Sequence, residues 1–390
     1  MEIYDIAVVG GGPAGCMAAI QGAMHGKKVI ILDKNDKIGR KLLLTGNGRC
    51  NLTNSSNLDV FMDKFGREGF FYRDAFQTFN SADLLKFFQE YGLEFKEEED
   101  GRVFPVTDKA ESVLHVLNKA IEELQIKIIH NFHVQHLYKH SKIFKLTSHK
   151  DDVLTSYSTI MATGGASYRS TGSTGDGFKI AEKLGHKITD LQPGEVPLTL
   201  KEGWAHDLKG ITLDDVGLSV QIGGRIKPLK RGGVLFTHFG LSGPAVLDVS
   251  HEVVKILKTQ GDLKLYVDFT PDIYEKELEE NLIDDFSKSS KKNLKNYFKT
   301  YLPKKMVEPI LTSMSLDPDR KLNQITKKER KQFIKILKSL PLTINGHLPL
   351  DKAMITCGGV SQKEINPKTM ESRLVPDLYF AGEIIDGCGH

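Results

Sequence analysis

A glycine-rich turn near the start of the chain is the feature that most constrains its fold. Residues 10–15 read Gly-Gly-Gly-Pro-Ala-Gly, which has the G-x-G-x-x-G spacing. The turn follows an apolar, β-branched run at 3–9 and precedes small, helix-tolerant residues at 13–25, and a second apolar run lies at 28–32. Strands that are apolar on both faces are typical of parallel sheets buried under helices. The sequence therefore predicts a strand–turn–helix–strand unit of the α/β class.

This turn is typical of a dinucleotide-binding site. Gly10 would permit the tight turn, Gly12 would let the backbone approach a pyrophosphate, and Gly15 would let the helix pack closely on the strand. The pyrophosphate would lie at the positive end of the helix dipole. Asp33, which ends the second apolar run, could accept hydrogen bonds from ribose hydroxyls. We also count the neighbours Pro13, Ala14 and Lys34 as cofactor ligands. The turn alone leaves FAD and NAD(P) both open.

The other glycines are also concentrated in loops. Four clusters, at 10–15, 39–48, 164–177 and 358–389, hold 17 of the 36 glycines. The second cluster adds cations and amides to its glycine N–H groups, a combination that suits a phosphate or the polar edge of an isoalloxazine. Its candidate ligands are Arg40, Lys41, Gly46, Asn47, Gly48 and Arg49.

The remaining sequence predicts three further kinds of structure. Short strands divided by polar turns at 126–161 indicate a β-meander. Short strands and Gly-rich turns at 196–270, without a convincing helix, indicate a β-rich domain. No glycine lies between Gly261 and Gly346, and residues 271–340 are rich in Lys, Glu and Leu with prolines at intervals, which favours a small set of helices.

Several motifs resemble one family of flavoproteins. The βαβ unit, a meander ending in Ala-Thr-Gly-Gly at 162–165 and a C-terminal strand ending in Gly-Glu resemble the glutathione-reductase-like FAD superfamily. Within it, Gly-Asn-Gly-Arg-Cys-Asn-Leu-Thr-Asn at 46–54, the glycine-rich turn at 172–177 and Thr-His-Phe-Gly-Leu-Ser-Gly-Pro at 237–244 look like the YhiN/BaiN-like family, which includes proteins named aminoacetone oxidases. Thr-Met-Glu-Ser at 369–372 fits it too, and the resemblance runs essentially end to end.

The resemblance implies an α/β fold in which a Rossmann-like FAD-binding domain carries an inserted β-rich domain and a small helical domain. The expected boundaries are 1–190 and 355–390 for the FAD-binding domain, 191–270 and 341–354 for the β-rich substrate domain, and 271–340 for the helical domain. Besides the residues above, the resemblance implies that FAD contacts Val134, Thr163, Gly164, Gly382, Glu383 and Asp386.

The resemblance also raises an expectation about the end of the chain. Family members continue beyond a segment like 386–390 with a Gly-Gly-Tyr-Asn turn and a final helix that faces the flavin, whereas this sequence stops at His390. We expect a chain that ends there to purify with little bound FAD.

The resemblance implies an FAD-dependent oxidoreductase with a small organic substrate, and it leaves two reactions open. One is oxidation of a small amine by oxygen, and the other is reduction of an activated C=C bond. Arg49, Cys50 and His238 are candidate catalytic residues, although a packed or satisfied side chain is the simpler interpretation of Cys50 and His238. No second G-x-G-x-x-G unit is present, so NAD(P)H would act only as a transient electron donor.

Charge and cysteine usage narrow the partners. The net charge of +3 dictates neither a membrane nor a nucleic-acid partner. No run is long enough and apolar enough to span a membrane, and four widely spaced cysteines predict neither a disulfide framework nor a metal site, which suits a reducing cytoplasm. Residues 286–338 carry 15 Lys or Arg against 4 Asp or Glu. This leaves RNA binding or modification by the helical domain as an alternative, behind a solvated surface.

Overall fold

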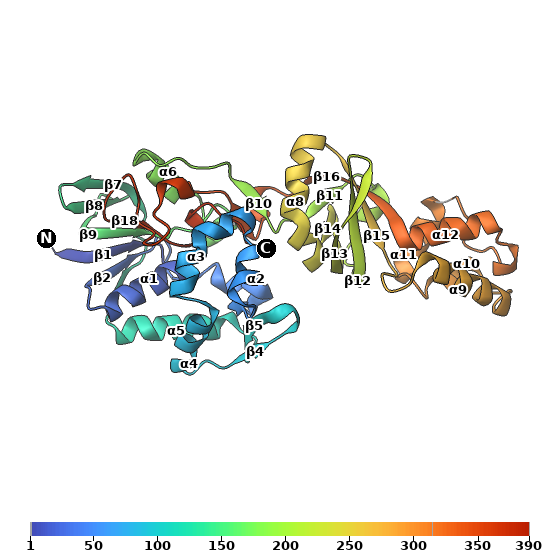
Figure 1. The fold of residues 1–390 in the computed structure, drawn as a ribbon, viewed down its shortest axis with the longest axis horizontal. Helices are drawn as coiled ribbons and strands as arrows, with labels where there is room; N and C mark the ends of the chain where they lie inside the picture. Colours follow the sequence, from blue (N-terminus) through green and yellow to red (C-terminus); the bar gives the residue numbers. More distant parts are fainter. Residues whose placement is uncertain (1, 314, 390) are drawn as a thin grey trace. The chain divides into compact units, whose positions relative to one another are not determined.

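The computed structural model describes residues 2–313 and 315–389, which form two compact units (Figure 1). The first unit is Met1–Gln192 together with Met354–His390, and the second is Pro193–Ala353. The first therefore draws on both ends of the chain. None of the helices in the described ranges has the length and apolar character that crossing a membrane requires.

A mixed sheet organises the first unit. Its strands lie in the order β6-β2-β1-β9-β8-β7, and β18 pairs with the second half of β9. Strands β6, β2, β1, β9 and β18 are parallel, whereas β7, β8 and β9 form an antiparallel meander. The strands are β1 (Ile3–Val9), β2 (Val29–Leu32), β6 (Lys127–Ile129), β7 (Val134–His140), β8 (Ile143–Ser148), β9 (Val153–Met161) and β18 (Leu378–Phe380).

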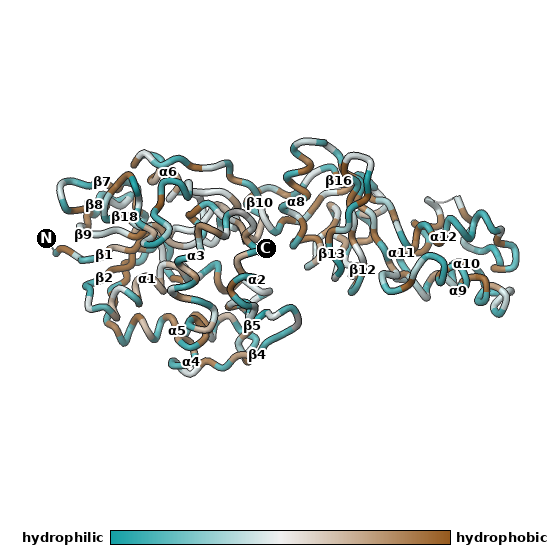
Figure 2. The backbone as a smooth tube through the Cα atoms, viewed as in Figure 1, coloured by the Kyte–Doolittle hydropathy of each residue, from teal (hydrophilic) through white to brown (hydrophobic). Residues whose placement is uncertain are grey.

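The predicted N-terminal unit is present, with β1 at the predicted residues and β2 fully buried. Figure 2 shows much brown, hydrophobic chain in this central sheet. The observed meander has one strand fewer than expected, because β6 pairs with β2 in the parallel part of the sheet.

Helices and a small sheet complete the first unit. Helix α1 packs against β1, β2 and α5, and their apolar side chains form one core. The helices are α1 (Pro13–Met24), α2 (Leu58–Asp63), α3 (Gly69–Thr78), α4 (Ser81–Glu90), α5 (Ala110–Glu123) and α6 (Asp176–Lys183). The short strands are β3 (Thr53–Asn54), β4 (Phe95–Glu97), β5 (Arg102–Pro105) and β17 (Ile355–Cys357).

A closed barrel forms the centre of the second unit. Its strands follow the order β11-β14-β13-β12-β15-β16, so the chain leaves the barrel after β15 and returns as β16. The strands of this unit are β11 (Leu198–Leu200), β12 (Thr212–Ile222), β13 (Arg225–Phe236), β14 (Gly240–Ser242), β15 (Leu263–Asp268) and β16 (Leu340–His347). The short strand β10 (Gln192–Gly194) begins at the last residue before the unit boundary.

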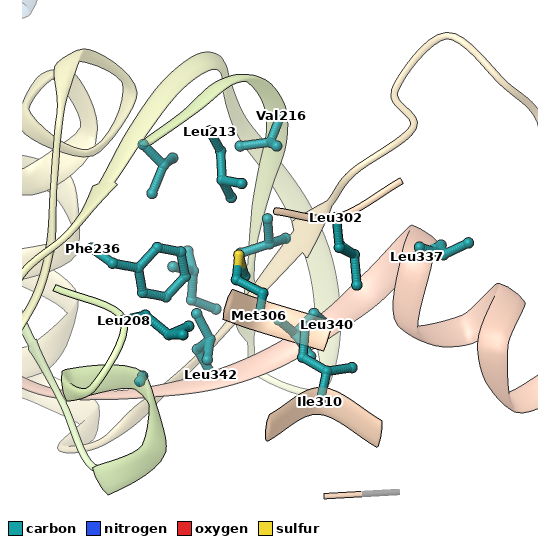
Figure 3. Close-up of a cluster of buried hydrophobic side chains, with 14 of the residues drawn as sticks. Leu208, Leu213, Val216, Phe236, Leu302, Met306, Ile310, Leu337, Leu340 and Leu342 are labelled. Atoms are coloured by element: carbon teal, nitrogen blue, oxygen red, sulfur yellow. The ribbon is translucent and has the colours of Figure 1, made fainter. Parts of the chain in front are cut away.

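Helices between β15 and β16 share one apolar core with the barrel. Met306 and Ile310 of the helical segment lie among side chains of the barrel such as Phe236 and Leu342 (Figure 3). A common core holds the two segments together as one compact unit. The helices of the second unit are α7 (Gly203–His206), α8 (Pro244–Gln260), α9 (Glu275–Lys288), α10 (Leu294–Phe298), α11 (Lys304–Ser313) and α12 (Lys327–Ser339).

Two expectations were wrong. The β-rich segment 196–270 contains α8, a 17-residue helix that begins with Pro244 at its first turn and buries Val246, Val249 and Val253 on one face. The cysteines were expected to be unpaired, but Cys357 and Cys388 form a disulfide with their Cα atoms 5.1 Å apart. Their 31-residue separation in sequence gave no sign of this pairing, which depends on the fold bringing the two segments together.

Candidate cofactor site

A cavity of about 420 Å³ opens at the carboxyl ends of β1, β2 and β9 in the first unit. Ligands of doubly wound sheets bind at this edge, where loops leave the parallel strands. The predicted residues that line the cavity are Gly10, Gly12, Pro13, Ala14, Asp33, Lys34, Arg40, Lys41, Val134, Thr163, Gly164 and Glu383.

The glycine-rich turn brings the backbone close to this cavity. Gly10 has φ of +109°, and a Cβ added there would lie 2.4 Å from the Ala162 carbonyl oxygen. A Cβ on Gly15 would lie 1.9 Å from the Gly10 carbonyl oxygen, so α1 can approach the turn only because Gly15 lacks a side chain. A Cβ on Gly12 meets no atom within 4 Å, although Gly12 lines the cavity. Gly12 thus leaves open the space that faces the start of α1.

Asp33 fixes the turn from the end of β2. Its buried carboxylate accepts hydrogen bonds from the Gly11 N–H at 2.6 Å and from the Asn35 N–H at 2.7 Å. No side chain caps the start of α1, where Gly12 is the N-cap residue. An acidic residue and an uncapped helix N-terminus therefore lie on the same cavity wall.

An ionic cluster lies beside Asp33. The Lys34 ammonium is 2.8 Å from a carboxylate oxygen of Asp176 and also contacts the Thr174 hydroxyl, and His133 Nε2 lies 3.0 Å from the same carboxylate oxygen. Partial burial acts to raise the pKa of Asp176, but hydrogen bonds from Lys34 and Thr174 and the Lys34 charge outweigh it and lower this pKa to about 2. Asp176 lies in the glycine-rich turn at 172–177. The sequence motif identified this turn but did not predict a role for Asp176.

A second ion pair joins the two ends of the chain. Lys41 Nζ lies 2.8 Å from Glu383 Oε2 and donates a hydrogen bond to the Ser167 hydroxyl at 2.8 Å. The other oxygen of Glu383 accepts a hydrogen bond from the Thr356 N–H at 2.6 Å. Both charged side chains line the cavity. Their pairing holds the 39–48 loop against the segment that follows β18.

Arg49 of the second glycine-rich segment makes its contacts outside the cavity. Arg49 lies 2.7 Å from a carboxylate oxygen of Glu98 and 3.6 Å from Asp108, with its guanidinium 4.0 Å from the centre of the Phe104 ring. These contacts hold the Arg49 charge on the small β3-β5-β4 sheet. Among the described residues, the predicted ligands that do not line the cavity are Gly15, Gly46, Asn47, Gly48, Arg49, Gly382 and Asp386.

The cavity also has an apolar wall that sequence reasoning missed. The buried Cys50 borders it, and burial raises the pKa of the Cys50 thiol. Besides Cys50, the wall includes side chains from α4, α5 and the residue before β3, namely Leu52, Leu84, Phe88, Val113 and Leu117. His238 belongs to the second unit, where its ring lies 4.9 Å from that of Phe239.

The residues present fit a dinucleotide. Thr163 lines the cavity with a buried hydroxyl oxygen that has no hydrogen-bond partner among the described residues. Gly12 and the uncapped N-terminus of α1 leave room and positive potential for a pyrophosphate. Asp33 retains lone pairs for a ribose. An orphaned polar atom and an open backbone cradle are what a tightly bound nucleotide would fill.

Comparison with known proteins decides the family. A family model described as HI0933-like protein Rossmann domain matches residues 4–390. The chain belongs to this family. It is 30% identical over 390 residues to a ribosomal RNA dihydrouridine synthase of Escherichia coli, covering 100% of this chain and 93% of that protein. It is 29% identical over 386 residues to a 3-dehydro-bile acid delta(4,6)-reductase of Clostridium scindens, covering 98% and 92%.

A solved structure shares the fold. The open conformation of a flavocytochrome c3 fumarate reductase aligns with a TM-score of 0.51 at 16% identity, covering 99% of this chain and 73% of that one. The expected family and fold class are thus confirmed. The chain thus has the Rossmann-like fold that the resemblance implied.

Proposed function

We propose that this HI0933-like protein reduces a C=C bond conjugated to a carbonyl group. The observation that carries this proposal is the reaction type shared by its named relatives. A delta(4,6)-reductase acts on a C=C bond, and a dihydrouridine differs from a uridine by two hydrogens across the C5=C6 bond of the uracil ring. In both molecules a carbonyl can stabilise the charge that develops on hydride addition. These names favour reduction over the amine oxidation that the sequence left open.

The residues that would hold FAD follow from the cavity. Gly12 and the start of α1 would contact the pyrophosphate, Asp33 the adenosine ribose and Val134 the adenine. The Thr163 hydroxyl, which has no partner among the described residues, would donate a hydrogen bond to a cofactor oxygen. When bound, FAD supplies the hydride. The Lys41–Glu383 pair would hold the 39–48 loop and the segment after β18 together beside the bound cofactor.

Among the candidate catalytic residues, Cys50 has the best-placed side chain. It borders the cavity, and its raised pKa keeps the thiol protonated near pH 7, as a proton donor to the substrate carbon would require. The Arg49 guanidinium is held by Glu98 and Asp108 and does not reach the cavity.

Uridine in RNA is the substrate that we favour. Two relatives named ribosomal RNA dihydrouridine synthase, from E. coli and Haemophilus influenzae, are each 30% identical to this chain, and the basic stretch 286–338 suits a polyanion. A steroid-like enone is the second candidate, because one relative is named as a 3-dehydro-bile acid delta(4,6)-reductase and the cavity has an apolar wall.

Direct reduction separates the two substrates. The FAD-loaded protein is reduced under argon, with NADH and NADPH tested as donors, and mixed with bacterial ribosomal RNA that lacks dihydrouridine or with a 4-en-3-one steroid. The proposal expects dihydrouridine by mass spectrometry of the digested RNA. Saturated steroid alone would support the second candidate. Peroxide formation from aminoacetone in air, with neither substrate reduced, would overturn the proposal.

A further inference from the structure

We infer that the outer face of α12 is a docking surface for RNA phosphates. This surface consists of Lys327, Lys328, Lys331 and Lys335, all of them exposed. The inference deepens the proposed function and rests on RNA as its substrate.

The helix sets these cations in a row. Lys327, Lys331 and Lys335 follow one another at intervals of four residues, which places them on one side of α12 about 6 Å apart. The opposite side buries Phe333 and Leu337 in the core that the helices share with the barrel. The row is therefore fixed on a packed helix, so little order needs to be imposed when a ligand binds.

No acid on α12 neutralises the row. Glu329 is the single acidic residue of this helix, and its carboxylate accepts hydrogen bonds from the Thr326 N–H and hydroxyl in a capping box. It also pairs with Arg320. The Glu329 carboxylate is thus already paired at the start of the helix. Within the described ranges the four lysines have no ion-pair partner.

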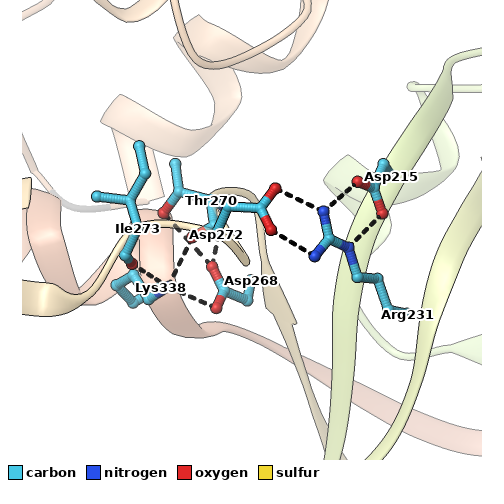
Figure 4. Close-up of polar contacts among 7 residues, drawn as sticks. All are labelled: Asp215, Arg231, Asp268, Thr270, Asp272, Ile273 and Lys338. Atoms are coloured by element: carbon cyan, nitrogen blue, oxygen red, sulfur yellow. Dashed lines mark hydrogen bonds and ion pairs between the residues drawn. The ribbon is translucent and has the colours of Figure 1, made fainter.

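Two other cations of the second unit, Arg231 and Lys338, form structural ion pairs. Arg231 forms bidentate pairs with Asp215 and Asp272, with N–O distances of 2.6 to 2.8 Å, and Lys338 lies 2.7 Å from Asp268 (Figure 4). These cations connect the barrel to the helical segment. The four lysines on α12 make no such structural contact, although they are costly to hold together because like charges at this spacing repel.

The acidic residues of the helical segment are concentrated on another helix. Helix α9 carries six of them, Glu275, Glu277, Glu279, Glu280, Asp284 and Asp285. Figure 2 shows long hydrophilic stretches in this part of the chain. Segregated charge differs from the interspersed charge of an ordinary solvated surface. A polyanion that contacts α12 would release counterions and gain affinity from the row.

The apolar side chains of α12 favour RNA over a lipid surface. Phe333, Ile334 and Leu337 are buried, and among its described residues α12 has no large exposed apolar side chain. A membrane-bound amphipathic helix would present such side chains to the lipid. The row offers charge alone, which matches a phosphate backbone.

Charge removal tests the surface. In the variant Lys327→Gln/Lys331→Gln/Lys335→Gln, we expect the affinity for a fluorescein-labelled oligouridylate to fall at least tenfold at low salt. The slope of log K against log salt should decrease by about 2, since each phosphate contact contributes about 0.7 for a single strand. The matched control is Lys142→Gln/Lys145→Gln/Lys150→Gln, which removes three exposed charges in the β7–β8 region. It should bind like the parent protein.

Two further measurements keep this test decisive. The variant Lys327→Arg/Lys331→Arg/Lys335→Arg should retain binding, because it keeps the charge and packing of the helix. All variants should reduce free uridine or a small enone at the parent rate. Unchanged oligouridylate binding by the glutamine variant would overturn the inference. The inference would also be overturned if the glutamine variant lost binding to phosphatidylglycerol vesicles while it bound oligouridylate like the parent protein. Failure of the parent protein to form dihydrouridine, with α12-dependent RNA binding intact, would instead count against the proposed function.

Discussion

Lys41 and Glu383 lie 342 positions apart in the sequence and form an ion pair of 2.8 Å on the wall of the cofactor cavity. Each side chain is about a fifth to a quarter exposed. The pair joins the glycine-rich loop after β2 to the segment after β18, so the two ends of the chain build one wall of the site together. This relationship gives the first prediction.

Replacement of Glu383 should weaken both the fold and the site. Glu383→Gln leaves the Lys41 ammonium partly buried without its counter-charge, and we expect a loss of about 1 to 3 kcal/mol in the free energy of unfolding by urea titration. The double variant Lys41→Gln/Glu383→Gln should recover part of this loss, because it leaves no unpaired charge. Equal stability of Glu383→Gln and the parent protein would show that the pair contributes nothing.

Alanine at two glycines of the same turn should affect two different properties, FAD affinity at Gly12 and stability at Gly15. A Cβ on Gly12 meets no protein atom within 4 Å, so Gly12→Ala should change stability by less than about 0.5 kcal/mol yet weaken FAD binding at least tenfold. A Cβ on Gly15 collides with the Gly10 carbonyl oxygen, so Gly15→Ala should cost about 2 kcal/mol or more. Thermal unfolding and flavin fluorescence titration measure the two effects. Undiminished FAD affinity in Gly12→Ala would remove Gly12 from the site.

Asp176 should make stability depend on acid pH. Its pKa is about 2 in the folded protein against the ordinary 3.8, so the unfolded chain takes up this proton first as the pH falls. The stabilisation is complete above about pH 4 and is lost as the pH falls toward 2. Since the side chain is 31% exposed, we expect a contribution of about 1 kcal/mol. Asp176→Asn should lack this part of the pH dependence in urea titrations at pH 2 to 5. A parallel curve for the variant and the parent protein would contradict the assignment.

Cys50 should react slowly with alkylating reagents. Burial raises the pKa of its thiol, and the thiolate is the reactive form. We expect iodoacetamide to modify Cys50 at least tenfold more slowly in the folded protein than in urea, as peptide mass spectrometry would show. Rapid modification of the native protein at pH 7 would mean that Cys50 is ionised, and would exclude it as a proton donor.

The sequence predicted those parts of the fold that depend on local pattern. The strand at 3–9, the turn at 10–15 and the helix that begins at Pro13 follow from apolar runs and glycine spacing, and the structure contains them. Helix α8 was missed because its glycine-rich flanks resembled strand turns. Pro244 at its first turn and apolar residues three or four positions apart were signals of a helix.

Tertiary pairing was harder to predict. Arg49 looked like a cofactor ligand because it lies in a glycine-rich loop, but its charge is held by Glu98, a residue 49 positions away. Local spacing carries no information about such a partner. The same holds for the disulfide between Cys357 and Cys388 and for the apolar wall of the cavity. The binding roles assigned to the cavity residues stay predictions until a ligand is measured.

A single-turnover reaction under argon tests the central claim most directly. The FAD-loaded protein is reduced, mixed with ribosomal RNA that lacks dihydrouridine, and followed by flavin absorbance and by mass spectrometry of the nucleosides. Reduction of a conjugated C=C bond predicts reoxidation of the flavin together with about one dihydrouridine per flavin. A flavin that stays reduced in the presence of the RNA and of a steroid enone, and is reoxidised only when oxygen is admitted, would contradict it.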